Sequence, residues 1–370
     1  MNDLRPPSLA GLRIAQLVET DGPGGGERMV VHLTKALQAA GAEVALYLPE
    51  RGQGWVASQF SPGEVAIEYF HLERPFSRRF AAGLAESLRR QRVSVAHSHD
   101  FSMAFYGAWA AGRASVRHVI TMHGGDYYAR RWRRRLALRW AIARSQVTVA
   151  VSPALQAALC RDLWLPKRAI GVIPNGIPSS SARPADLAGE LALSPGARVL
   201  LAVGNLYAVK GHRHAIAALQ QIAQRHPEAH LVIAGRGELE GELRAQAEAL
   251  GVGGRVHLLG LRSDIPALLA AADVFLLPSL SEGLPVALLE AMFAGKAIIA
   301  SDVGGIAGAL GNGAAGILVR PGSEADLATG LDRLLSDPSA ARALGREATR
   351  RAEAEFRLET MLSRYAALYR

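Results

Sequence analysis

The chain has 370 residues, more than a single hydrophobic core usually supports, so two domains are expected. Hydrophobic residues make up 49% and charged residues 20%, which excludes a disordered chain and is ordinary for a globular protein. The 42 Lys and Arg against 33 Asp and Glu give a formal charge of +9, which favours anionic partners such as nucleotides, nucleic acid or acidic lipid.

Short apolar runs alternate with helical patterns along both halves of the chain. Uninterrupted β-branched strands separated by helices, such as Arg28–Ala40 and Phe80–Arg90, are typical of a parallel sheet covered on both faces. The sequence therefore predicts an α/β protein of two doubly wound, Rossmann-like domains. The expected strands are Arg13–Val18, Glu43–Leu48, Val93–His97, His118–Met122 and Val147–Val151, then Val199–Val203, His230–Ala234, Arg255–Leu259, Val274–Leu277, Ala297–Ala300 and Gly316–Val319.

A segment rich in Pro and Ser, Ile177–Ala197, interrupts this alternation and has the composition of a linker. It places the domain boundary near residue 180, with an N-terminal domain at 1–180 and a C-terminal domain at 181–350. Residues 351–370 are predicted to form a final amphipathic helix. The single cysteine, Cys160, excludes an internal disulfide, and with no secretory signal expected the protein is predicted to be cytoplasmic.

The first strand runs into a glycine-rich loop, Asp21–Arg28, that leads into a helix. Such a loop lets the backbone approach a phosphate at the helix N-terminus. A dinucleotide-binding fingerprint would place a third glycine where Glu27 stands. Two alternatives remain open: a tight turn without a ligand, and an NAD-dependent oxidoreductase in which Glu50 would bind the ribose.

Histidines and an aspartate are expected at the carboxyl ends of the next strands, where open α/β sheets bind ligands. His97, His99 and Asp100 follow one strand, and His123 to Asp126 follow the next. A metal site is the alternative, but the spacing matches no compact set of ligands.

In the second half, Gly204-Asn205 follows the first strand and Lys210 comes shortly after it, where a lysine suits a diphosphate. A solvated lysine is the alternative. Arg236, between two glycines, follows the next strand.

The most specific pattern is Glu282-Gly283-Leu284-Pro285, with Glu290 on the following helix. Pro285 suits a first helical turn. Glu290 stands among apolar residues, where a carboxylate is costly to bury unless it is hydrogen-bonded. Ribose hydroxyls would be natural partners, and a carboxylate satisfied by backbone is the alternative.

This ordered set resembles glycosyltransferase family 4, the retaining transferases of GT-B fold. The resemblance covers nearly the whole chain and implies two Rossmann-like domains facing a cleft, with the C-terminal helix crossing back to the first domain. The matching pieces are Gly24-Gly25 with Glu27-Arg28, His123-Gly124, Pro174-Asn175-Gly176-Ile177, Lys210-Gly211, Glu282 with Glu290, and Asp302-Val303-Gly304-Gly305.

The resemblance implies transfer of a sugar from a nucleoside-diphosphate sugar to an acceptor, as in cell-envelope or extracellular glycan and glycolipid synthesis. His123, Glu282 and Lys210 would be catalytic, and His99, His123 and Asp126 would lie on the acceptor side. No cofactor and no obligatory metal are expected. A GT-B-fold sugar-nucleotide epimerase is a further alternative. The residues assigned to the donor are Gly24, Gly25, Asn205, Lys210, Arg236, Glu282, Gly283, Leu284 and Glu290.

Within that assignment, Lys210 would pair with the diphosphate, Glu290 would hold the ribose, and Glu282 would hold the transferred sugar. Many family members carry arginine where this chain has Asn205, and Arg236 is a candidate to compensate. Charge developing on the leaving phosphate would be stabilised by Lys210 and by loop N–H groups.

Seven arginines lie in the segment 130–144, together with Trp132, Leu136 and Trp140 at helical spacing. Arginine with interfacial tryptophan is typical of a helix that lies on acidic lipid, so a peripheral position on the inner face of the cytoplasmic membrane is one interpretation. A solvated helix whose tryptophans pack on the domain is the other.

Overall fold

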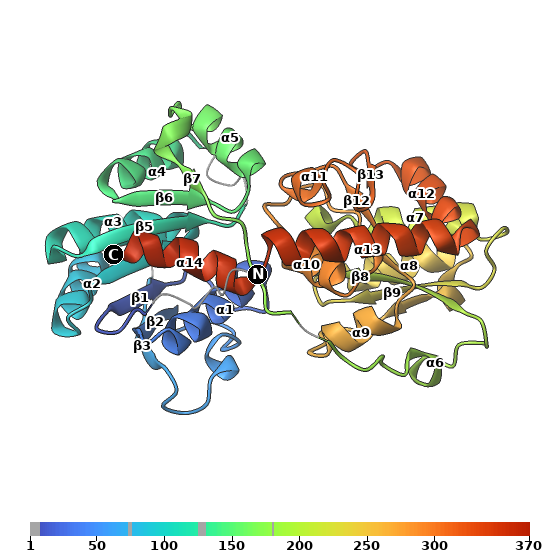
Figure 1. Ribbon diagram of the computed structural model, residues 1–370, viewed down its shortest axis with the longest axis horizontal. Helices are drawn as coiled ribbons and strands as arrows, with labels where there is room; N and C mark the ends of the chain where they lie inside the picture. The colour runs from blue at the N-terminus through green and yellow to red at the C-terminus, as the bar shows by residue number, and fades with distance from the viewer. Residues whose placement is uncertain (1–7, 73–75, 125–130, 180) are drawn as a thin grey trace. The chain divides into compact units, whose positions relative to one another are not determined.

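The computed structural model describes residues 8–72, 76–124, 131–179 and 181–370. The chain divides into two compact units (Figure 1). The first comprises residues 1–178 together with 356–370, and the second comprises residues 179–355.

The first unit is a doubly wound α/β domain. Its described residues form a parallel sheet of seven strands in the order β3-β2-β1-β4-β5-β6-β7. The order reverses between β1 and β4, the position where such sheets bind ligands. The strands are β1 (Arg13–Leu17), β2 (Glu43–Pro49), β3 (Ala66–Phe70), β4 (Val95–His99), β5 (Arg117–Met122), β6 (Val147–Ala150) and β7 (Gly171–Val172). The helices are α1 (Gly25–Ala39), α2 (Arg78–Arg90), α3 (Asp100–Ala114), α4 (Trp132–Arg144), α5 (Pro153–Asp162) and α14 (Leu358–Tyr369).

Strand β4 begins two residues later than the sequence predicted. The Val93 N–H closes on the Leu88 carbonyl at the end of α2 (3.0 Å), so Val93 belongs to a helix cap. The strand also ends two residues later than predicted, at His99, so both His97 and His99 lie inside it, buried in the sheet. Strands β3 and β7 were not predicted, because β3 is a half-exposed edge strand and β7 has two residues.

The second unit repeats this plan. Its described residues form a six-stranded parallel sheet in the order β10-β9-β8-β11-β12-β13, which reverses between β8 and β11. The strands are β8 (Arg198–Val203), β9 (Ala229–Ala234), β10 (Val256–Leu258), β11 (Val274–Leu277), β12 (Ala297–Ser301) and β13 (Ile317–Val319). The helices are α6 (Leu187–Glu190), α7 (His212–Ile222), α8 (Glu240–Ala249), α9 (Ile265–Ala271), α10 (Val286–Phe293), α11 (Ile306–Ala309), α12 (Glu324–Ser336) and α13 (Pro338–Glu355).

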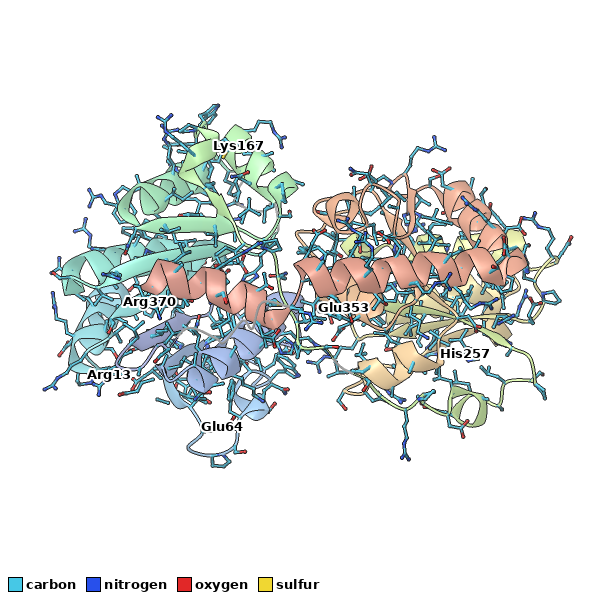
Figure 2. All side chains as sticks on the ribbon, viewed as in Figure 1. Arg13, Glu64, Lys167, His257, Glu353 and Arg370 are labelled. Carbon is cyan, nitrogen blue, oxygen red and sulfur yellow. The ribbon has the colours of Figure 1, made fainter. Side chains whose placement is uncertain are left out.

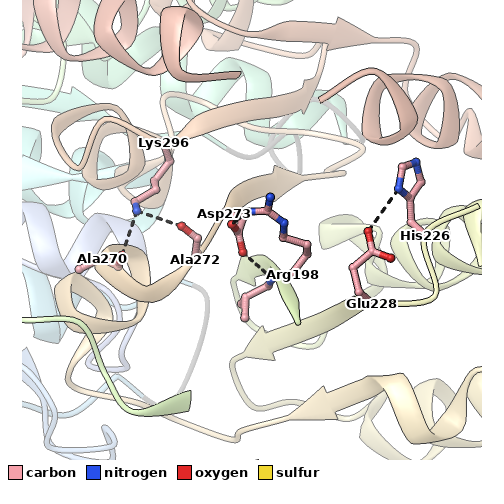
Figure 3. A network of polar contacts seen from close by, with 8 residues as sticks. Arg198, His226, Glu228, Ala270, Ala272, Asp273 and Lys296 are labelled. Carbon is pink, nitrogen blue, oxygen red and sulfur yellow. Dashed lines mark hydrogen bonds and ion pairs between the residues drawn. The ribbon is translucent and has the colours of Figure 1, made fainter. Parts of the chain in front are cut away.

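Polar side chains close the ends of several second-unit elements (Figure 3). The Lys296 ammonium donates to the carbonyls of Ala270 (3.0 Å) and Ala272 (2.9 Å), which belong to the end of α9. A cation at this position satisfies carbonyls that a helix end leaves unpaired. Asp273 accepts from the Arg198 guanidinium (2.7 Å) and the Val199 N–H (2.8 Å). These groups stabilise the fold.

The last predicted helix, residues 351–370, is wrong at its start. Residues 351–355 continue α13, and the helical path breaks at Phe356. There the Ile177 N–H donates to the Phe356 carbonyl (3.0 Å) and the Leu358 N–H donates to the Ile177 carbonyl (3.1 Å). These two bonds take the place of helical ones, and α14 then packs within the first unit.

Candidate active site

In the first unit, buried polar side chains gather at the carboxyl ends of β1, β4 and β5. The register pairs Gln16 with His97 and His99 with Thr121, which brings these side chains to one level of the sheet. His99 Nε2 is 2.6 Å from Gln16 Oε1, and His99 Nδ1 is 2.9 Å from His123 Nε2. The His99 and His123 rings stack with centroids 5.1 Å apart. The structure thus joins His99 and His123, the two described residues that the sequence assigned to the acceptor side.

These histidines are neutral at pH 7. Burial lowers the pKa of His123 to about 4 and holds the pKa values of His97 and His99 well below 6.5. Neighbouring imidazoles reinforce the effect at His97 and His99. Each ring therefore offers one N–H and one lone pair, and none supplies an imidazolium charge.

Asp100 adds a carboxyl group to this cluster. It opens α3 with φ near +60°, a left-handed conformation that is uncommon outside glycine. Its Oδ1 accepts the His123 N–H (3.0 Å). Although part of its surface is exposed, desolvation raises the pKa of Asp100 to about 7. Gly26 faces both residues, since a Cβ there would lie 3.8 Å from Asp100 Oδ2 and 3.7 Å from His123 Cγ.

Asp126, also assigned to the acceptor side, lies outside the described residues. The sequence named Asp100 without assigning it a role, and it did not find Gln16, Thr121 or Tyr369 as partners of the histidines. Gln16 and Thr121 are single polar residues within apolar strand patterns, and Tyr369 continues the apolar side of a helix, so nothing in the sequence marked them as partners of the histidines.

The glycine loop of the first unit ends at the N-terminus of α1. Gly24 is the N-cap residue, and no side chain caps the helix at this position. The Glu27 carboxylate, which lies in the first turn, accepts the Thr20 hydroxyl (2.5 Å). A Cβ at Gly24 would collide with that carboxylate. Gly24 and Gly25 thus belong to a helix start of the kind that binds anions.

In the second unit, Lys210 and Glu282 form an ion pair. Lys210 Nζ is 2.7 Å from Glu282 Oε1, and the Ser279 hydroxyl donates to the same oxygen (2.7 Å). The Glu282 side chain is only 9% exposed and that of Lys210 27%, so the carboxylate is neutralised locally while the ammonium stays accessible. An ammonium has three N–H donors, and among the described residues only Glu282 accepts one of them, which leaves two for a ligand.

Close backbone contacts hold this pair in place. Gly211 has φ +66°, and a Cβ there would collide with the Pro278 carbonyl. Gly304 has φ +56°, and a Cβ there would collide with the Glu282 carbonyl. The Gly305 N–H donates to the Gly283 carbonyl (2.7 Å). The loops after β8, β11 and β12 are therefore locked against one another around Glu282.

The other predicted donor residues lie at the same end of this sheet. Arg236 is exposed, and its carbonyl accepts the Leu206 N–H (2.9 Å), which attaches it to the loop that carries Asn205. Leu284 is buried at the start of α10. Glu290 lies in α10 and is part-exposed, whereas most of that helix is buried. Among the residues that the structure describes, no three His, Cys, Asp or Glu side chains are grouped as metal ligands would be.

Two family profiles cover almost the whole chain. Residues 23–181 match the profile described as Glycosyltransferase Family 4, and residues 186–351 match the one described as Glycosyl transferases group 1. A glycogen synthase of Mycobacterium tuberculosis is 31% identical over 297 residues, which are 76% of this chain and 69% of that protein. The chain belongs to glycosyltransferase family 4. An NAD-dependent oxidoreductase is not supported.

Other relatives match over shorter lengths. The UDP-Gal:alpha-D-GlcNAc-diphosphoundecaprenol alpha-1,3-galactosyltransferase of Escherichia coli is 31% identical, over 60% of this chain and 61% of that protein. The 2-deoxystreptamine glucosyltransferase of Streptomyces kanamyceticus is 30% identical, over 54% of each protein. The chain thus spans little more than half the length of these two relatives.

Solved structures share the fold. Anabaena HepE in complex with UDP-glucose superposes with a TM-score of 0.83 at 23% identity, covering 96% of this chain and 98% of that one. WaaG, a glycosyltransferase involved in lipopolysaccharide biosynthesis, gives a TM-score of 0.74 at 19% identity, covering 96% of this chain and 99% of that one. The predicted GT-B fold is confirmed.

Proposed function

We propose that this family 4 protein transfers a sugar from a nucleoside-diphosphate sugar to an acceptor hydroxyl, with retention of the anomeric configuration. The observation that carries the proposal is the Lys210–Glu282 pair, in which an accessible ammonium adjoins a carboxylate held by Ser279. Lys210 faces the diphosphate and Glu282 faces the sugar hydroxyls. Two similar proteins support a nucleotide-sugar donor: HepE was solved in complex with UDP-glucose, and the name of the Escherichia coli protein gives UDP-Gal as its donor.

In the proposed reaction the bond between the anomeric carbon and the phosphate oxygen breaks, and the acceptor oxygen bonds to the same face of that carbon. The acceptor proton passes to the departing phosphate oxygen. Lys210 stabilises the charge on that oxygen. Glu282 Oε1 accepts from Lys210 and Ser279, and we assign this carboxylate to binding and not to attack on the anomeric carbon.

The neutral histidines have a separate part in this proposal. Because burial keeps the pKa of His123 near 4, its ring is a neutral imidazole at pH 7 and does not act as an acid toward a leaving group. It binds a hydroxyl as a hydrogen-bond partner instead. No cofactor is assigned, and the nucleotide sugar is the substrate.

A thermal-shift panel tests the donor class. Ligands that bind the native state stabilise it by mass action. We expect one of the UDP-, GDP- or ADP-sugars to raise the melting temperature, and the matching free nucleoside to raise it far less. NAD is the control. A shift with NAD alone would contradict the proposal.

We further propose that the acceptor is lipid-linked and that the enzyme works at an acidic membrane surface. The support is a basic aromatic face on α4 and the end of α5, made of Trp132, Leu136, Trp164, Arg131, Arg133 and Arg135. Trp132, Leu136 and Trp164 are 64%, 50% and 63% exposed. The Arg135 guanidinium lies 5.8 Å from the Trp164 ring centroid.

This face differs from the one that the sequence predicted. Trp140 packs against Phe105 with ring centroids 5.3 Å apart, so it belongs to the domain. Trp164 replaces Trp140 on the exposed face. Its backbone has φ +51°, and the Arg139 guanidinium holds this turn by donating to the Leu163 and Trp164 carbonyls (both 2.7 Å). Arg130 lies outside the described residues. Over the described ranges no helix has the length and apolar character to span a membrane.

Vesicle co-sedimentation tests this surface. Each basic residue near an acidic bilayer contributes roughly 1 kcal/mol, and salt screens that attraction. We expect binding to acidic vesicles at low salt, weaker binding at high salt, and none to neutral vesicles. Replacement of Arg131, Arg133, Arg134 and Arg135 by Gln should abolish it. The charge-matched control replaces the exposed Arg213, Arg342, Arg346 and Arg364 by Gln. Equal loss in both variants would show only a net-charge effect and contradict the assignment.

A further inference from the structure

Two tyrosines of the C-terminal helix α14 reach the histidines of the first unit. Tyr365 and Tyr369 are 2% and 0% exposed. The Tyr365 hydroxyl is 2.9 Å from Thr121 Oγ1, and the Tyr369 hydroxyl is 2.7 Å from His97 Nδ1. Buried phenol hydroxyls that lack partners are costly, so both contacts fix the helix against the sheet.

The end of α14 is held as well. The Arg117 guanidinium donates to the Tyr369 carbonyl (2.9 Å), and the Arg370 guanidinium donates to the Ser8 carbonyl (2.8 Å). Figure 2 shows Arg370 at the end of this helix, in the same unit as Arg13 of β1. Tyr369 is therefore not at a frayed end.

The Gln16 amide links Tyr369 to His99. Gln16 is fully buried, and its Oε1 is 2.6 Å from His99 Nε2. Its Nε2 has no hydrogen-bond partner among the described residues. The Gln16 side chain nevertheless lies near the Tyr369 hydroxyl, where it partly offsets the rise in the pKa of that phenol that burial causes. A nearby N–H donor lowers the pKa of a phenol because it stabilises the phenolate. The nitrogen end of the amide thus faces Tyr369, and the oxygen end faces His99.

This orientation determines where the histidine protons lie. Gln16 Oε1 can only accept, so His99 Nε2 carries the proton of that neutral ring. His99 Nδ1 then has a lone pair and accepts from His123 Nε2–H. His123 is neutral too, so its Nδ1 is left with a lone pair. That nitrogen is buried and has no hydrogen-bond partner among the residues that the structure describes.

We propose that Tyr369 and Gln16 are positioning residues that fix the tautomer of His123, with the proton on Nε2 and the lone pair on Nδ1 aimed at a substrate hydroxyl. The assignment rests on the proposed function only in naming that hydroxyl. A half-turn of the Gln16 amide would turn its N–H group toward His99 Nε2. The protons of His99 and His123 would then both move to Nδ1, and His123 Nδ1 would become a donor. Tyr369 opposes the half-turn because its hydroxyl lies near the nitrogen end of the amide.

The direct test is ¹⁵N NMR of histidine-labelled full-length protein near pH 7.5, with His123 assigned by loss of its signals in His123→Gln. We expect an unprotonated Nδ1 and a protonated Nε2. Gln16→Leu and Tyr369→Phe should introduce the opposite tautomer. Tyr365→Phe is the matched control: it loses the same hydroxyl from the same helix but leaves the Tyr369 hydroxyl beside Gln16, so His123 should not change.

Kinetics add a second readout. Gln16→Leu and Tyr369→Phe should lower kcat at least about tenfold, whereas Tyr365→Phe should not. Nucleotide affinity, assigned to the second unit, should stay unchanged in all three, and tryptophan fluorescence reports folding of the first unit, to which every tryptophan belongs. A His123 proton on Nδ1 in the wild type, or a tautomer indifferent to Gln16→Leu, would overturn the inference even if transfer activity is found. Absence of transfer with the expected tautomer would instead count against the proposed function.

Discussion

The carboxyl ends of the two sheets hold opposite chemistry. In the first unit, His97, His99 and His123 are neutral and linked through hydrogen bonds to buried amide and hydroxyl groups. In the second unit, Lys210 and Glu282 form an ion pair that remains partly accessible. A diphosphate needs a cation, whereas a sugar hydroxyl needs a neutral donor or acceptor of fixed orientation. Under the proposed function, the charged cluster of the second unit (the charged half-site) binds the diphosphate, and the neutral cluster of the first unit (the neutral half-site) binds a hydroxyl group.

The two half-sites also differ in what holds them. Around Glu282, glycines at positive φ let three loops touch through their backbones. Around His123, side chains from β1, β4, β5 and α14 interlock, and Asp100 joins Gly124 in having a positive φ. Substitutions should therefore act through charge in the second unit and through proton placement in the first.

The largest expected effect is that of Lys210→Met. Loss of the ammonium should lower kcat/KM by about 10²–10³-fold, the usual cost of one group that stabilises a developing anion. Calorimetry should show weaker binding of the nucleoside diphosphate and unchanged binding of the nucleoside. Lys167→Met, in the first unit, is the control. Equal losses for both ligands would show that Lys210 does not contact phosphate and would remove the contrast between the half-sites.

Glu290→Ala should weaken donor binding by about 2 kcal/mol or more, because hydrogen bonds to a charged group are lost and the ribose hydroxyls are left unpaired. That corresponds to about a 30-fold rise in Kd, measured by calorimetry. Glu242→Ala, on α8, should leave Kd unchanged. An unaltered Kd in folded Glu290→Ala would remove Glu290 from the donor site.

The smallest predicted effect concerns a histidine outside the site. His118 lies between the Ser98 hydroxyl (2.8 Å) and the Ser145 hydroxyl (2.7 Å), and burial lowers its pKa to about 3. The unfolded chain takes up this proton below about pH 6.5, whereas the native state does not. The stability that the neutral ring provides is therefore present above pH 6.5 and lost as the pH falls.

His118→Gln should remove this loss. Between pH 7.5 and 5.0 the wild type should lose about 2 kcal/mol of unfolding free energy more than the variant. Denaturant unfolding followed by tryptophan fluorescence reports this unit selectively, because Trp55, Trp109, Trp132, Trp140 and Trp164 all belong to it. Identical pH dependence in both proteins would contradict a neutral, buried His118.

The sequence predicted the two sheets because their central strands are runs of apolar and β-branched residues, which hardly any other structure tolerates. It misplaced β4 because Val93 and Val95 look alike in a strand pattern, and only the bond from Val93 to Leu88 shows that the first belongs to a helix cap. It found Lys210 and Glu282 singly but not as a pair, because their contact depends on three loops meeting.

The polar partners of the histidines could not be predicted. Gln16 and His99 are 83 positions apart, and Tyr369 and His97 are 272 apart. In the sequence Gln16 is one polar residue within a strand, and Tyr369 continues the apolar side of a helix. Only the packing of α14 on the sheet shows that both belong to the site.

The stereochemistry of transfer tests the central claim most directly. With the donor identified by the thermal-shift panel, proton NMR can follow the first sugar released to water or transferred to an acceptor, before the anomers of free sugar interconvert. We predict that an α-linked donor gives an α-configured product first, without a trapped covalent sugar–enzyme adduct. A β-configured first product would contradict same-face attack at the Lys210–Glu282 half-site.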